Sequence, residues 1–193
     1  MTLNPHHADT HRDRGVARLH AGRVGEAEGD LAAALARNPG DPEALMFHGL
    51  ALFATKRYSE ASERFDRCDS LGYPYVYLTL WRAMARARSG SEARSVLRQV
   101  SGVLSPEEWP RPLVLAFLDP AKAPEAVRGA PPTRRDEASF YVAAWALSEE
   151  QRETPARRDA RERARRALEQ VSSRGDPRSI AVLMARIELA RLR

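Results

Sequence analysis

Apolar and small residues recur along the chain at helical spacing, and one such pattern is written twice. Between residues 11 and 74, four positions are repeated at a distance of 34 residues: Gly15 and Gly49, Ala27 and Ala61, Leu31 and Phe65, and Ala34 and Cys68. A glycine inside a helix costs about 1 kcal/mol relative to alanine. We therefore expect the two helices of each pair to approach closely at these glycines, against the small residues of the second helix.

The same periodicity predicts three helix pairs before residue 102. The expected helices cover residues 9–21 and 24–37, 41–55 and 59–70, and 73–88 and 91–100, with the third pair shortened at its turn. Residues 1–8 are expected to form a disordered leader.

The predicted helix ends rest on residues with known local preferences. Gly22 is typical of a left-handed helix terminus, and Asp41 followed by Pro42 is typical of a helix start. Lys56 occupies the position of the second pair that corresponds to Gly22. The second turn therefore departs from the usual residue choice.

The pattern changes after residue 101. Pro110 and Pro112 restrict the next helix to residues 113–118, and a shorter helical piece is expected at 124–128. We expect residues 102–133 to form a connector that packs against the repeats and is not a separate domain.

Residues 134–193 return to the repeat pattern. An apolar face predicts a helix over residues 135–148, and a charged insertion at 149–159 follows it. The next helix repeats the small, large, small spacing of the earlier pairs, at Ala164, Leu168 and Val171. A helix over residues 177–192 is expected to cap the chain, with Ile180, Leu183, Met184 and Ile187 on one face.

Two stretches resemble known families. The 34-residue register resembles the tetratricopeptide repeat family over residues 9–74 and implies stacked helix pairs that present a binding surface. The strings EEWPRPLVLAFLD, EASFYVAAWAL and IELARL, within residues 106–192, are similar to the C-terminal half of bacterial tetratricopeptide lipoproteins of the outer membrane. That resemblance implies an adaptor of the kind that brings cell-wall hydrolases to a processing protease. The chain departs from those lipoproteins because no lipid-acceptor cysteine lies near its start.

Composition indicates a soluble protein. Of the 193 residues 43% are hydrophobic, enough for a core, and Cys68 is the single cysteine, which excludes a disulfide within the chain. No run approaches the roughly 18 apolar residues that a membrane span needs, and the first residues lack an apolar signal region. We expect no membrane span and a cytoplasmic location, or an envelope location if a leader has been removed.

The first candidate site is an apolar concave groove. In the repeat family the first helix of each pair lines the concave surface. At these positions the chain carries Met46, Leu50, Phe53, Tyr77, Leu80, Trp81 and Met84, with Arg12 as the main charged exception. This composition does not favour a carboxylate clamp, but it suits a partner helix or an extended apolar segment. The alternative is that the C-terminal helices or a second copy of the chain cover these side chains.

The second candidate site is an arginine-rich surface. The formal net charge is +5, and residues 151–193 carry 12 arginines against 6 acidic residues. The arginines between residues 151 and 167 are Arg152, Arg157, Arg158, Arg161, Arg163, Arg165 and Arg166. Because no aromatic residue for base stacking lies among them, nucleic acid is not favoured and an acidic protein is the candidate partner. The alternative is a solvated helix face with internal ion pairs to Glu153, Asp159 and Glu162.

Metal binding and catalysis are not favoured. His6, His7, His11 and His20 lie near the N-terminus without a supporting carboxylate pattern or a HExxH motif. His48 is expected to pack within the repeats, and Cys68 is expected to be a buried thiol because it replaces a small packing residue. The sequence contains no recognisable nucleophile, phosphate loop or paired-carboxylate motif.

These patterns together predict an all-α protein, a right-handed solenoid of three to four repeats with a C-terminal capping helix. We expect a non-catalytic adaptor, without cofactor or metal, that binds another protein. The expected binding surfaces are the apolar groove, the arginine-rich surface at Arg157, Arg158, Arg161 and Arg165, or both. A self-assembling homodimer is the alternative, and an enzyme with a pocket enclosed by the C-terminal helices is a second one.

Overall fold

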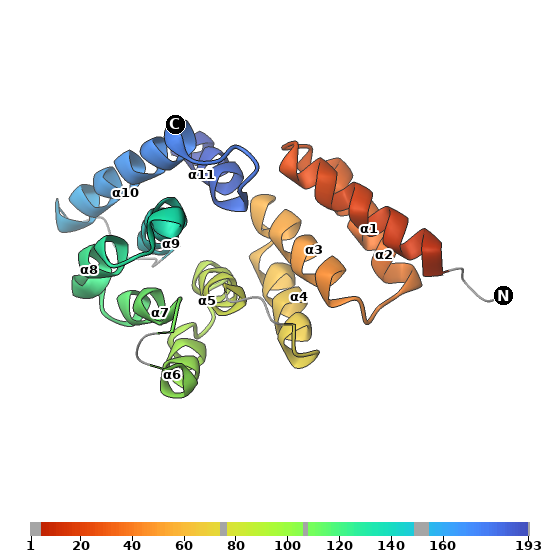
Figure 1. Ribbon diagram of the computed structural model, residues 1–193, viewed down its shortest axis with the longest axis horizontal. Helices are drawn as coiled ribbons and strands as arrows, with labels where there is room; N and C mark the ends of the chain where they lie inside the picture. The colour runs from red at the N-terminus through yellow and green to blue at the C-terminus, as the bar shows by residue number, and fades with distance from the viewer. Residues whose placement is uncertain (1–4, 74–76, 106–107, 149–154, 193) are drawn as a thin grey trace. The chain divides into compact units, whose positions relative to one another are not determined.

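The computed structural model describes residues 5–73, 77–105, 108–148 and 155–192, and these form helices without a strand (Figure 1). The predicted all-α class is confirmed. The chain divides into two compact units, Met1–Ala85 and Arg86–Arg193. Residues 102–133, predicted as a connector, belong to the second unit together with the C-terminal helices.

The first unit is built from two helical hairpins and the start of a further helix. Its helices are α1 (Pro5–His20), α2 (Val24–Arg37), α3 (Pro42–Ala54) and α4 (Tyr58–Ser70), and α5 (Leu78–Arg88) begins in this unit and ends in the next. Helices α1 and α2 pack together, as do α3 and α4 (Figure 1). Helix α1 begins four residues before the expected start at residue 9, so the prediction of a disordered leader over residues 1–8 is wrong from Pro5 onward.

The start of α3 is fixed by the predicted cap. The Asp41 carboxylate accepts hydrogen bonds from the backbone N–H groups of Glu43 and Ala44, each at 3.0 Å, and Pro42 occupies the first turn. The side chain thereby satisfies two N–H groups that have no partner within the helix. The predicted Asp-Pro helix start is confirmed.

The repeated glycines lie where the helices of a pair touch. A Cβ atom built on Gly15 would lie 2.8 Å from Leu31 Cγ, and one built on Gly49 would lie 2.5 Å from Phe65 Cε1. Leu31 and Phe65 are fully buried. The predicted close approach of the two helices is therefore confirmed in both repeats.

Helices α1 and α3 end with the same backbone motif, but its left-handed position is a glycine in α1 and a lysine in α3. In α3, the N–H of Lys56 donates to Phe53 O and the N–H of Arg57 donates to Leu52 O, which is a Schellman motif. Lys56 has a φ of 66°, whereas Gly22 at the corresponding end of α1 has a φ of 76°. A non-glycine residue is strained in this left-handed region.

We expect Lys56→Gly to stabilise the protein. Relief of the left-handed strain exceeds the extra conformational entropy of glycine in the unfolded chain, for a net gain of about 1 kcal/mol. Chemical denaturation of the wild type and the variant measures the gain. Gly22→Ala is the reciprocal control and should lower the free energy of unfolding by a similar amount. An unchanged denaturation midpoint for both variants would contradict the expected strain at Lys56.

The second unit contains six further α-helices among the described residues. They are α6 (Arg94–Val103), α7 (Arg111–Leu118), α8 (Ala123–Arg128), α9 (Arg135–Ser148), α10 (Pro155–Arg174) and α11 (Ile180–Arg191), with 3-10 turns η1 (Pro120–Lys122) and η2 (Pro132–Arg134). The Trp109–Pro110 peptide bond is cis. Helix α9 has the predicted bounds and packs against α7, α8, α10 and α11.

Several predicted boundaries in this unit need correction. The helix expected over residues 91–100 runs from Arg94 to Val103, and the helix expected over residues 113–118 begins at Arg111, because Pro112 lies in its first turn. The charged insertion was expected to run to residue 159, but α10 already begins at Pro155; residues 149–154 lie outside the described part. The last helix begins at Ile180 and not at residue 177, because the Ser179 hydroxyl accepts from Ala181 N–H at 3.1 Å and caps the helix there. Ala164, Leu168 and Val171 are buried on α10, as the repeat spacing predicted.

Candidate functional site

The apolar side chains predicted for a groove are buried. Met46, Leu50, Phe53, Tyr77, Leu80, Trp81 and Met84 are each at most 4% exposed. Within the first unit, the Phe53 ring meets those of Tyr58 and Trp81 edge to face, each with centroids 5.2 Å apart. These side chains are packing residues in this structure. Contact with a partner would need the helices to separate, so binding through them stays a prediction.

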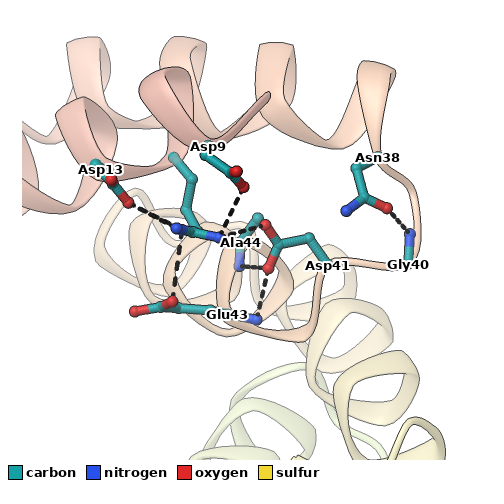
Figure 2. Close-up of polar contacts among 8 residues, drawn as sticks. Asp9, Asp13, Asn38, Gly40, Asp41, Glu43 and Ala44 are labelled. Atoms are coloured by element: carbon teal, nitrogen blue, oxygen red, sulfur yellow. Dashed lines mark hydrogen bonds and ion pairs between the residues drawn. The ribbon is translucent and has the colours of Figure 1, made fainter. Parts of the chain in front are cut away.

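Arg12, the charged residue of the predicted groove, is engaged by carboxylates of α1 and of the start of α3. Figure 2 shows these carboxylates on Asp9, Asp13, Asp41 and Glu43. The Arg12 guanidinium lies 3.2 Å from Asp9 and 2.9 Å from Asp13 on α1, and 3.1 Å from Asp41 and 3.4 Å from Glu43 at the start of α3. Partial burial opposes the charged form of Arg12, but the hydrogen bonds that its guanidinium donates to Asp13 and Asp41 outweigh burial and raise its pKa. Arg12 thus ties α1 to the cap of α3 and is already occupied by carboxylates of its own chain.

A second internal ion cluster, which the sequence did not predict, joins α1 to α2. The buried Asp30 carboxylate accepts from Arg14 at 2.6 Å and from Arg18 at 2.5 Å, and His11 Nδ1 lies 3.6 Å away. The hydrogen bond from Arg14 is the main cause that lowers the pKa of Asp30 to about 2. A polar residue at this helical position gave no sign of burial in the sequence pattern, because its arginine partners lie 12 and 16 positions away.

The two other titratable candidates are buried as predicted. Cys68 Sγ donates to Pro42 O at 3.2 Å, and burial raises the pKa of its thiol to about 12, so it is an inert packing residue. His48 is 6% exposed, and its Nδ1 has no hydrogen-bond partner in the described part of the chain. Burial, followed by the nearby charges of Arg64 and Arg57, lowers the pKa of His48 to about 4.

The buried imidazole makes stability depend on pH. The folded state holds His48 neutral down to about pH 4, whereas the unfolded chain protonates it near its ordinary pKa of about 6.5. Protons therefore favour the unfolded state as the pH falls from 6.5 towards 4, and we expect the urea midpoint to fall over this range. In His48→Gln the urea midpoint should fall distinctly less between pH 6.5 and 4.

The partly exposed His20 supplies the control for the pH experiment. Because His20 is not buried, His20→Gln should change the slope of the urea midpoint between pH 6.5 and 4 less than His48→Gln does. Equal slopes in all three proteins would show that His48 is not the group responsible. Below pH 4, a further loss is expected as Asp30, whose pKa is lowered, becomes protonated.

The N-terminal histidines whose side chains the structure describes are His7, His11 and His20. Among the residues that the structure describes, no group of three or more His, Cys, Asp or Glu side chains is placed to hold a metal ion. His11 lies beside Asp30, and the His20 ring lies 6.2 Å from that of Phe47. Nothing is described for the His6 side chain.

The arginine-rich surface is exposed along α10. Arg158, Arg161, Arg163, Arg165 and Arg166 are all exposed, whereas the side chain of Arg157 and all of Arg152 lie outside the described part. Part of the surface is internally paired, since Glu162 lies 3.1 Å from Arg166 and Glu169 lies 3.1 Å from Arg165. Such exposed pairs contribute little to stability.

Within the second unit, α7, α8, α9 and α10 enclose an open depression that we call the trough. It has a volume of about 820 Å³. Phe117 and Trp145, stacked with ring centroids 4.5 Å apart, line its apolar base together with Val142 and Ala143 of α9. Helix α10 contributes mainly alanines, at Ala160, Ala164 and Ala167.

The charged groups of the trough are all of one sign. Arg128 of α8 and Arg163 of α10 line it, and among its described lining residues no acidic side chain occurs. Both arginines are exposed, and neither has an acceptor within the described ranges. The trough combines an apolar surface with two unpaired positive charges, an arrangement that suits recognition of an anionic apolar partner. The sequence could not indicate it, because the lining comes from four helices of which α8 is only six residues long.

The tetratricopeptide repeat model matches residues 3–42 and 12–67, so the N-terminal part of the chain, from α1 into α4, is similar to tetratricopeptide repeats. The matched part does not include the helices that line the trough. A search of curated protein sequences finds no match to the chain. Within the described residues, no helix has the length and apolar character that crossing a membrane requires.

Proposed function

We propose that the protein is a non-catalytic adaptor that binds an acidic protein through the arginines of α10. Tetratricopeptide repeats generally mediate protein–protein interactions by presenting helical surfaces. The observation that carries the finer proposal is the exposure of five arginines on one helix, of which Arg158 has no acceptor among the described residues. Positive side chains in this arrangement steer and orient an acidic partner.

The adaptor proposal is tested by capture of partners on the purified full chain. The bait is compared with Arg158→Glu/Arg161→Glu and with Arg98→Glu/Arg186→Glu, a control on exposed positions of α6 and α11. Both double variants change the net charge equally. We expect a protein retained by the wild type and the control to be lost from the α10 variant. Equal loss from both variants would mean that total charge, and not the α10 surface, holds the captured protein.

The oligomeric state in solution distinguishes the adaptor proposal from the homodimer alternative. Light scattering over a dilution series should give the mass of a single chain at micromolar concentration if the adaptor proposal is right. A dimer that persists on dilution would favour the self-assembly alternative.

A further inference from the structure

We infer that the trough of the second unit is a docking site for an amphipathic helix that carries acidic residues on both sides of an apolar stripe. The inference rests on the proposed protein-binding function and specifies a different surface, partner conformation and charge pattern. It concerns only helices of the second unit, all of which lie outside the matched repeats.

The dimensions of the trough fit a short helix. Its lining on α10 extends from Ala160 to Gln170, which corresponds to about 15 Å at the 1.5 Å rise of a helix. On α9 it extends from Ser139 to Ala146. Two to three turns of a partner helix would therefore find continuous contact along the trough.

The lining residues suit close helix packing. Ala160, Arg163, Ala164 and Ala167 follow one another at intervals of three, one and three residues, so they form one stripe along α10. Alanines on this stripe leave room for the larger apolar side chains of a partner, as in helix-in-groove recognition. Helix α9 already packs against both α8 and α10, which supply the two arginines (Figure 1).

The charges select the partner. Arg128 and Arg163 come from different helices, and neither has a carboxylate within hydrogen-bond distance in the described part of the chain. A helix with glutamates on both flanks of its apolar stripe would give each arginine its own partner. The lining also extends for about 15 Å along α10, a length that suits a helix better than a small apolar anion.

The experiment uses the full chain and a labelled peptide of about 15 residues, long enough for measurable helix formation. Its leucines are placed at i, i+3, i+4 and i+7, and its glutamates lie on both flanks. A second peptide carries lysine in place of each glutamate. Fluorescence anisotropy measures the affinity of both peptides for the wild type, Arg128→Glu/Arg163→Glu and the control Arg98→Glu/Arg186→Glu.

We expect the glutamate peptide to bind the wild type and the control equally and the trough variant at least about tenfold more weakly. The lysine peptide should show the opposite preference and bind the trough variant best. This exchange of preference also establishes that the trough variant is folded. A second variant, Ala167→Phe, should block the trough by bulk, whereas Ala190→Phe on the exposed side of α11 should not.

Several results would overturn the inference. They are absence of glutamate-peptide binding to the wild type, equal weakening in both charge variants, and binding that Ala167→Phe leaves unchanged. A wild-type dimer that Ala167→Phe dissociates would assign the trough to a second copy of the chain. Direct binding of dodecanoate to the wild type but not to Arg128→Glu/Arg163→Glu, with no peptide binding, would assign the trough to a small apolar anion.

Failure of this inference and failure of the adaptor proposal are distinguishable. If a captured protein is lost from Arg158→Glu/Arg161→Glu but retained by Arg128→Glu/Arg163→Glu, the adaptor proposal stands without the trough. If the peptide binds the trough but no captured protein depends on the α10 arginines, the inference about the trough is supported and the proposal for the α10 surface is contradicted.

Discussion

Glu188→Ala is expected to destabilise the protein by about 4 kcal/mol, because it removes a buried carboxylate that pairs with two arginines. The Glu188 carboxylate accepts from Arg88 at 2.6 Å and from Arg191 at 2.5 Å. The side chains of Arg88 and Glu188 are only 8% and 5% exposed, so water cannot replace the missing carboxylate. Chemical denaturation of the variant measures the loss.

A graded series separates charge from volume at this pair. Glu188→Gln keeps a hydrogen-bond acceptor for Arg88 and should lose less than Glu188→Ala. The double variant Arg88→Met/Glu188→Leu removes both charges and should recover most of the stability, since a buried ion pair is often no better than apolar packing. Glu162→Ala, at an exposed pair with Arg166, is the control and should cost at most about 1 kcal/mol. Similar losses for Glu188→Ala and Glu162→Ala would contradict the importance of burial.

The Arg88–Glu188 pair marks a limit of what the sequence could predict. Its partners are separated by 100 residues, and Arg88 also donates to Ser148 Oγ at 2.8 Å and to Ala144 O at 3.3 Å. The last helix was predicted from its apolar residues, and Glu188 was not distinguished from a solvated acid. Long-range pairing of this kind depends on how helices of one unit meet, which local periodicity does not encode.

The repeats were predictable for a local reason. A glycine on the first helix of each pair leaves room for a large side chain of the second, Leu31 or Phe65, and both partners recur after 34 residues. Gly15 and Gly49 therefore identified the packing before any tertiary contact was known. Capping was equally local, since Asp41 bonds N–H groups two and three residues ahead.

The binding surfaces were harder to predict. An apolar stripe has the same sequence pattern whether it faces a partner or the core, and Phe53 and Trp81 proved to be core residues. The trough could not be predicted because its residues form no distinctive sequence pattern. Its alanines resemble ordinary helix formers, and its two arginines, 35 positions apart, come together only because α8 and α10 border the same depression.

Gly49→Ala is expected to destabilise the protein by about 2 kcal/mol, although alanine is the better helix former. The added Cβ would lie 2.5 Å from Cε1, 2.8 Å from Cδ1 and 2.9 Å from Cζ of Phe65, whose ring is fully buried. Overpacking of this kind typically costs about 1 to 3 kcal/mol. The contact with Phe65 should cost an amount near the upper end of that range. Alanine has a higher helix propensity than glycine by up to about 1 kcal/mol, which offsets only part of this cost. The denaturation midpoint of the variant measures the net effect.

Two further glycines and a double variant test whether the contact with Phe65 is the cause. Gly29 lies inside α2, and a Cβ there would meet nothing within 4 Å, so Gly29→Ala should stabilise the protein by up to about 1 kcal/mol. Gly15→Ala should lose less than Gly49→Ala, because Leu31 is a more adaptable neighbour than an aromatic ring. In Gly49→Ala/Phe65→Leu the two changes should cost less together than the sum of the separate losses, since residues in contact are not additive. Strict additivity would place the origin of the loss elsewhere than in the contact between α3 and α4.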